Sequence, residues 1–333
     1  MSPPKTNVES MRVCLFLLLC VVAAAFSGAA TIEETFASDP ATHGWRSNGE
    51  RSLFHWNSAD GKLAVTWDSS KSNSFFCHPL GTILAKTEDC SLAFDLRLTD
   101  IAIGVNSNKQ SAFELAVGFI NLADAMQTHF LRGVGINPIT GPRNLIEFDY
   151  FPDSGFGATI SPTIVSSNNQ FAVGFDFPLE LTPGDLFRIT MTFTASNQTL
   201  VTVMTRNSQP FGPVKDVKLG TSFSDFRLDA VAVCSYSDAG ADGSILAHGM
   251  VDNLVVTVPD PPISSLAGIF TSDTRRVEFT GQTNWLYTLE RTEDFRLWTA
   301  VSPVTTGVEG RTTLSDVTTP TMREFYRVRA ERR

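Results

Sequence analysis

The stretch Phe187-Arg-Ile-Thr-Met-Thr-Phe193 decides the fold class. Its apolar residues alternate with polar ones, and because successive side chains of a strand point to opposite faces, the pattern predicts a strand with one buried face. A second run of the same kind, Leu200-Val-Thr-Val-Met204, follows after a short polar segment. The two runs therefore predict two consecutive β-strands.

The same pattern recurs along most of the chain. No stretch has sustained helical periodicity, and the best helical candidate, residues 120–132, is long enough for only one or two turns. Evenly spaced strands over about 230 residues predict an all-β fold in which residues 31–258 form a two-sheet jelly-roll β-sandwich. The further runs rich in β-branched or aromatic residues, bounded by Gly, Asn, Asp, Ser and Pro, are residues 63–67, 92–98, 113–119, 145–150, 228–233 and 250–258.

The composition agrees with a folded β protein. Of the 333 residues, 42% are hydrophobic, 10% are aromatic and only 18% are charged, which is enough apolar material for sizeable cores. Phe is unusually frequent, with 25 residues. This composition excludes a wholly disordered chain and argues against a coiled coil.

The first thirty residues predict a signal peptide. Lys5 and Arg12 precede an apolar run at residues 13–26, and the small residues 27–30 follow it. A run of this length is short for a membrane span, which needs about 20 residues, although a retained anchor stays an alternative. We expect cleavage near Ala30, a protein that is secreted or held at the cell surface, and no membrane insertion after the leader is removed.

Residues 259–263, Pro-Asp-Pro-Pro-Ile, predict a linker between two domains. Three prolines in five residues do not fit a central strand, and they favour a semi-rigid connector. Residues 264–333 contain short strand-like runs and predict a second, smaller β-sandwich. This tail has ten Arg, no Lys and nine acidic residues, so the net charge of the whole chain, −9, comes from the first domain. The negative charge argues against nucleic acid as a partner.

Several segments of the first domain resemble a known superfamily. Glu33-Glu-Thr-Phe36 with Gly44-Trp45, the central Ile146-Glu-Phe-Asp-Tyr-Phe-Pro-Asp153, and Val251-Asp-Asn-Leu-Val-Val256 resemble the first strand, the Glu-x-Asp strand and the last strand of concanavalin A-like lectins and glucanases. The resemblance is to the laminin G-like and legume lectin-like jelly rolls. It implies a jelly roll over residues 31–258 and a carbohydrate-related function.

The tail resembles a different module. Tyr287-Thr-Leu-Glu290, Leu297-Trp298 and Phe325-Tyr-Arg-Val-Arg329 are similar to a small fibronectin type III-like domain that occurs at the C-terminus of secreted bacterial proteins. This resemblance implies an accessory role for residues 264–333.

Glu147 and Asp149 are the sharpest candidates for a ligand site. On a strand, residues i and i+2 project from the same face, so the two carboxylates converge. Laminarinase-like and lichenase-like glycosidases place another carboxylate two or three positions after the Asp, where this chain has Phe151 and Pro152. The next carboxylate is Asp153. We therefore expect Glu147, Asp149 and Asp153 to bind a polysaccharide rather than to cleave it.

Aromatic side chains would complete such a surface. Trp56 and Phe75 lie in polar surroundings and are expected to stack on the apolar face of a sugar ring, although aromatic residues of a sandwich also form its core.

The resemblance to glucanases implies a structural calcium ion that joins the first and last strands. Its candidate ligands are Asp252 and Glu34, and the alternative for Asp252 is an ordinary strand-end turn. The acidic loop at residues 237–244 is either another calcium loop or, as we favour, a flexible turn. Cys77 and Cys90 pair in an oxidising compartment or remain buried thiols.

Other chemistries lack their motifs. The five histidines show neither H-x-H nor H-E-x-x-H spacing, and the chain has no G-x-S-x-G elbow and no glycine-rich phosphate motif. The sequence thus predicts a secreted, non-catalytic carbohydrate-binding or adhesive protein that recognises a polysaccharide on its concave sheet and is stabilised by calcium. Two alternatives stay open: a divergent polysaccharide hydrolase or lyase that uses Glu147 and Asp149 with Asp153 or Asp238, and a structural cell-surface protein.

Overall fold

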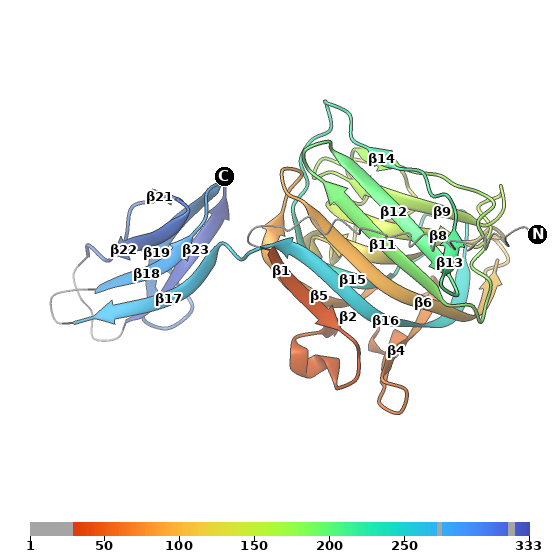
Figure 1. Cartoon of the computed structure of the whole chain (residues 1–333), viewed down its shortest axis with the longest axis horizontal. Coiled ribbons are helices and arrows are strands. Elements are labelled where there is room, and N and C mark those ends of the chain that lie inside the picture. The colour runs from red at the N-terminus through yellow and green to blue at the C-terminus, as the bar shows by residue number, and fades with distance from the viewer. Residues whose placement is uncertain (1–28, 272–274, 319–323) are drawn as a thin grey trace, which may run out of the picture.

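The computed structural model describes residues 29–271, 275–318 and 324–333. Almost all regular structure in these residues is β-strand, so the all-β prediction is confirmed (Figure 1). The described helices are single turns: α1 (Leu122–Ala125) and the 3-10 turns η1 (Pro40–His43) and η2 (Arg51–Leu53). None of the helices in the described ranges is long and apolar enough to cross a membrane. The predicted signal peptide lies outside the described residues, apart from Ala29 and Ala30.

Sheet A has nine described strands, which pair in the order β13-β12-β11-β6-β16-β4-β3, while β1 also pairs with β16 and β14 with β12. The pairing is antiparallel, and the register places Phe187 of β11 opposite Leu96 of β6. The strands of sheet A are β1 (Ala29–Glu34), β3 (Phe54–Asn57), β4 (Lys62–Asp68), β6 (Cys90–Ile103), β11 (Phe187–Thr194), β12 (Thr199–Arg206), β13 (Gln209–Phe211), β14 (Val217–Lys218) and β16 (Ile245–Pro259).

Sheet B has seven described strands in the order β10-β9-β8-β7-β15-β5-β2. Its centre is the antiparallel ladder β9-β8-β7-β15, in which Glu147 of β8 lies between Thr163 and Gly118. The strands of sheet B are β2 (Arg46–Asn48), β5 (Ser74–Leu84), β7 (Leu115–Ile120), β8 (Leu145–Phe151), β9 (Thr159–Val165), β10 (Phe171–Val173) and β15 (Leu228–Ser235).

The main core lies between sheets A and B. In β11, alternate residues from Phe187 to Phe193 are buried, as the opening sequence pattern predicts. Phe94 of β6 meets Phe148 of β8 with ring centroids 5.9 Å apart, which joins the two sheets. A side chain of Phe size buries well over 100 Å², so such pairs dominate the packing energy of the sandwich.

The C-terminal residues form two smaller sheets and a second core. One sheet has the order β17-β18-β22, and the other contains β20-β19-β21 with β23 paired to β19. Phe279 and Tyr287 meet at 4.8 Å between ring centroids in this core. The strands are β17 (Ile263–Phe270), β18 (Arg275–Gly281), β19 (Trp285–Thr292), β20 (Thr299–Ala300), β21 (Thr305–Thr306), β22 (Gly310–Ser315) and β23 (Phe325–Arg332).

The predicted linker begins on the last residue of β16 and ends on the first residue of β17. It runs between the two groups of sheets, which lie side by side in Figure 1. Its backbone is held by the second group, because the Tyr287 hydroxyl donates to the carbonyl of Pro262 (2.5 Å) and the Gln282 side chain donates to the carbonyls of Asp260 and Pro261 (3.0 Å each). Arg332 of β23 reaches back to Glu88 at 2.6 Å.

Of the two alternatives for Cys77 and Cys90, the structure shows buried thiols and not a disulfide. Cys77 lies on β5 in sheet B and Cys90 begins β6 in sheet A, and both are free buried thiols, as is Cys234. Burial raises the pKa of Cys77 to about 11 and that of Cys90 further, so the neutral thiol is the stable form of both. These cysteines pack as small apolar side chains.

Candidate functional site

Strand β8 presents Glu147 and Asp149 on one face of sheet B. Phe148, between them in sequence, points into the main core against Phe94 of sheet A. Glu147 and Asp149 therefore lie on the face turned away from sheet A, which we call the outer face of sheet B. Opposite Glu147 stands Gly118 of β7, where a Cβ atom would lie only 2.7 Å from the Glu147 Cγ atom. The glycine thus makes room for the Glu147 side chain.

The outer face of sheet B is covered at this point. Glu147 is 0% and Asp149 1% exposed. The cover is the segment of residues 121–144 between β7 and β8, which we call the strap. Phe130 of the strap stacks on Tyr236 with ring centroids 6.2 Å apart, and the Asn73 side chain donates to the Phe130 carbonyl at 2.7 Å.

Arg132 of the strap is the centre of the buried site. Its guanidinium lies 2.6 Å from Glu114, 2.8 Å from Asp149 and 3.6 Å from Glu147. Its Cζ atom lies 5.4 Å from the ring centroid of Tyr236, whose hydroxyl donates to Glu147. Three carboxyl groups thus share one guanidinium, and we call Glu114, Arg132, Glu147 and Asp149 the carboxylate cluster.

Burial raises the pKa of every carboxyl group in the cluster. It raises the pKa of Glu147 to about 7, against the opposing effect of Arg132. It also raises the pKa of Asp149, and it raises that of Glu114 well above its ordinary value. One cation cannot compensate three buried anions, so the cluster retains protons at neutral pH. Chemically it is a closed ionic and hydrogen-bonded network rather than an open ligand surface.

Sequence reasoning missed three members of this network. Glu114 is the third carboxyl group that the hydrolase alternative needed, and it takes the place proposed for Asp153 or Asp238. Arg132 comes from the strap, and Tyr236 is the residue that follows β15. The sequence offered only a weak signal for this site. A glycine within a strand, such as Gly118, indicates that another group packs closely against it, but only the strand register shows that this group is Glu147.

Asp153 is separate from the carboxylate cluster. It follows β8 in the loop to β9, and its carboxylate accepts a hydrogen bond from the backbone N–H of Gly155 at 2.9 Å. The structure therefore brings Glu147 and Asp149 together but assigns Asp153 to a surface loop.

The two predicted aromatic ligand residues have structural positions. Phe75 lies on β5 and is 0% exposed, packed edge-on against Tyr236 with ring centroids 5.8 Å apart, so its prediction as an exposed sugar platform is wrong. Trp56 lies on β3 and is half-buried, and its indole N–H donates to the carbonyl of Phe36 at 2.8 Å. The polar residues beside them in sequence alternate to the other face of their strands.

The predicted calcium ligands have other partners. The Glu34 carboxylate accepts hydrogen bonds from the backbone N–H of Phe36 (2.6 Å) and pairs with His43 (3.1 Å). Asp252 accepts from the N–H of Asn253 (2.8 Å) and lies 4.0 Å from the Lys62 ammonium. Within residues 29–271, 275–318 and 324–333, no group of three or more His, Cys, Asp or Glu side chains is arranged to hold a metal ion. These donors do not fit a calcium site, which needs six to eight oxygen ligands.

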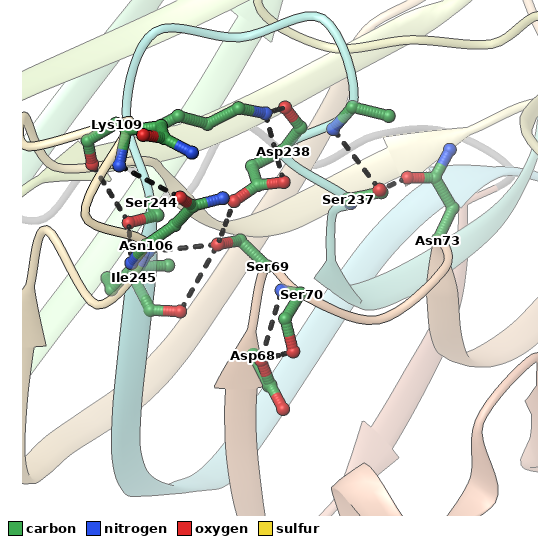
Figure 2. Close-up of polar contacts among 12 residues, drawn as sticks. Asp68, Ser69, Ser70, Asn73, Asn106, Lys109, Ser237, Asp238, Ser244 and Ile245 are labelled. Atoms are coloured by element: carbon green, nitrogen blue, oxygen red, sulfur yellow. Dashed lines mark hydrogen bonds and ion pairs between the residues drawn. The ribbon is translucent and has the colours of Figure 1, made fainter.

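The acidic loop at residues 237–244 is held by protein contacts. Figure 2 shows Asp238 between Lys109 and Ser69: the lysine ammonium lies 3.2 Å from the carboxylate and also donates to the Asp238 carbonyl, while the Ser69 hydroxyl donates to the carboxylate at 3.3 Å. The Ser69 hydroxyl also accepts from the N–H of Ile245 at 2.9 Å. These contacts join the loop to Ser69, which follows β4, and to Lys109, which lies between β6 and β7, and they occupy the Asp238 carboxylate.

Exposed aromatic side chains gather at another place. Phe156, Phe175 and Phe177 are 69%, 42% and 49% exposed, and their ring centroids lie 5.6 to 6.3 Å apart. We call these three residues the aromatic patch. Its two loops are joined because the backbones of Ile160 and Asp176 exchange two hydrogen bonds of 3.0 Å.

The comparisons with known proteins found structural likeness only. No protein-family model matches the sequence, and no curated protein matches it. Solved lectin structures resemble the chain over about two thirds of its length. Lectin II from Ulex europaeus has 8% identity over 70% of this chain and 98% of its own, with a TM-score of 0.45. A seed lectin of Lotus tetragonolobus has 13% identity over 70% and 100%, with a TM-score of 0.43. Arcelin-5, a lectin-like defence protein from Phaseolus vulgaris, has 11% identity over 70% and 100%, with a TM-score of 0.41.

Proposed function

We propose that this chain is a secreted, non-catalytic carbohydrate-binding protein and that it binds a polysaccharide at the aromatic patch. The observation that carries the proposal is the contact of three strongly exposed phenylalanines on two joined loops. Exposed apolar residues scattered singly are ordinary on a protein surface, whereas a contiguous group marks a binding surface. Secretion rests on the apolar leader at residues 13–26.

The chemistry around the aromatic patch suits a sugar. A pyranose ring has an apolar C–H face that stacks on an aromatic ring and a rim of hydroxyls that donate hydrogen bonds. Carboxylates lie next to the phenylalanines in the chain: Asp153 is three residues before Phe156, and Asp176 stands between Phe175 and Phe177. Asp176 accepts from the backbone N–H of Lys215 at 2.7 Å, which fixes its position at the patch.

The carboxylate pair on β8, Glu147 and Asp149, is not part of the proposed binding surface. Glu147 and Asp149 are enclosed by the strap and joined to Arg132, so a polysaccharide does not reach them in the closed structure. Of the carboxylates predicted to bind the ligand, Asp153 is the one on an accessible loop. The proposal contains no calcium ion, because the donors Glu34 and Asp252 have other partners.

Binding to a panel of soluble polysaccharides, measured by affinity gel electrophoresis of the whole protein, tests this proposal. An exposed aromatic contact contributes about 1 kcal/mol, so Phe156→Ala should weaken binding roughly fivefold. Phe295→Ala is the matched control, since Phe295 is 60% exposed and also contacts an exposed ring, that of Phe325 (40% exposed, ring centroids 4.1 Å apart), but lies between β19 and β20 of the C-terminal sheets. It should bind like the unmodified protein. The proposal fails if no polysaccharide retards the protein, or if Phe156→Ala and Phe295→Ala behave alike.

A further inference from the structure

The strap is fastened to sheet B at its two ends. At its start, the Asn121 side chain donates to the carbonyl of Arg227 (3.1 Å) and the N–H of Leu122 donates to the Asp229 carboxylate (2.8 Å). At its end, the Asn144 side chain accepts from the N–H of Arg227 (2.8 Å). The ends of the strap are thus fixed next to each other on the same strand end.

Between these ends, the strap inserts two side chains into the outer face of sheet B. Phe130 packs on Tyr236, and Arg132 enters the carboxylate cluster. A crevice of about 360 Å³ lies beside the strap, and Met126 and Leu131 of the strap form part of its wall. The strap is therefore closed by specific side-chain contacts, and open space adjoins it.

The contact made by Arg132 is unbalanced in charge. The titratable or charged groups that face Glu147 are Arg132 from the strap, Asp149 on the same strand, Glu114 before β7, and Cys234 and Tyr236 of the β15 segment. Arg132 is the cation among them. Each further ionised carboxyl adds a buried negative charge that the guanidinium cannot pair with at full strength.

We propose that the strap is a pH-controlled cover of the outer face of sheet B, which is firmly closed while the carboxylate cluster holds its extra protons and loosens as those protons leave. The proposal is independent of the polysaccharide site, because it concerns residues 121–144 and the face beneath them rather than the aromatic patch.

The direction of the pH effect follows from linkage. Glu147 has a pKa raised to about 7 in the closed protein, whereas a carboxyl exposed by opening returns to its ordinary value of 4.5. The stabilising effect is complete below pH 4.5 and is lost as the pH rises through about 7. For each proton released on opening, the opening equilibrium rises about tenfold per pH unit in this window. Glu114, whose pKa is raised well above its usual range, extends the effect to higher pH.

Hydrogen–deuterium exchange of the whole protein, followed by mass spectrometry between pH 5 and 8, measures the opening. Rates are converted to protection factors, so that the intrinsic pH dependence of exchange is removed. Peptides from the strap should lose protection as the pH rises, by about tenfold per unit for one proton. Peptides from β11 and β12 in the same sample report global unfolding, which exposes the same carboxyl groups and therefore has the same dependence on pH. Local opening of the strap requires that its peptides are less protected than those of β11 and β12 at every pH.

Two glutamine variants sharpen the experiment. Glu147→Gln keeps the shape and the neutral state of the protonated side chain, so its strap should be more protected at pH 7.5 and less dependent on pH. Glu88→Gln is the matched control, because Glu88 also has a raised pKa but faces Arg332 at the module junction, and it should leave the strap unchanged. The proposal is overturned if strap protection is constant over this pH range, if the strap is as protected as β11 and β12, or if Glu147→Gln shows the same pH dependence as the unmodified protein.

Discussion

Replacing Arg132 by Met tests how much the carboxylate cluster depends on its one cation. The substitution keeps an unbranched side chain under the strap but leaves Glu114, Glu147 and Asp149 buried without a positive partner. Removing one partner of a buried ion pair costs about 3–5 kcal/mol, because the remaining charge is uncompensated. We expect a loss in this range in the free energy of unfolding at pH 7.5. The loss should be smaller at pH 5, because burial raises the pKa of the carboxyl groups and fewer of them are ionised there.

Urea unfolding at the two pH values measures this loss. The control is Arg206→Met, since Arg206 pairs with Asp185 at the surface and is 42% exposed, and surface pairs contribute only about 0.2–1 kcal/mol. A loss at pH 7.5 no larger than that of Arg206→Met would refute the argument. So would a loss that is the same at both pH values, because charge imbalance would then not be its cause.

Three further predictions concern the frame of the molecule. Phe148→Ala should cost about 3–5 kcal/mol in urea unfolding, because Phe148 is fully buried against Phe94, whereas truncation of Val203, 59% exposed, should change stability by less than about 0.5 kcal/mol. Arg332→Ala should speed proteolytic cleavage at residues 259–263 by freeing the junction from Glu88, and an unchanged cleavage rate relative to the native protein would count against that contact. A thiol reagent added to native protein at pH 8, with the labelled sites mapped by mass spectrometry, should not modify the buried thiols of Cys77, Cys90 and Cys234 until the protein is denatured. Rapid labelling of the native protein would contradict their burial.

The sequence predicts the frame well where burial is one-sided. The alternation of residues 187–193 corresponds to β11, whose side chains are buried in alternation, and residues 63–67 lie within β4 for the same reason. One face of these strands contacts the core and the other does not, so the alternation of apolar and polar residues in the sequence matches the alternation of buried and less buried side chains.

The site is less predictable because it depends on a loop and on strand register. Glu147 and Asp149 alternate with apolar residues, which correctly places them on one face of a strand but implies that this face is solvated. The strap covers that face. Arg132 lies in an irregular segment without a periodic sequence pattern, so the sequence does not predict that its side chain is buried beside Glu147 and Asp149. Phe75 shows the same limit, since its polar neighbours Asn73 and Ser74 give no indication of the burial that Tyr236 provides.

Calorimetric titration of a retained polysaccharide at pH 5.5, where the strap is closed, tests the central claim most directly: the binding surface is the aromatic patch and not the β8 carboxylates. For the unmodified protein, Phe156→Ala and Glu147→Gln, the account predicts that Phe156→Ala weakens binding about fivefold while Glu147→Gln leaves the dissociation constant unchanged. Loss of binding in Glu147→Gln, with Phe156→Ala unaffected, would contradict it.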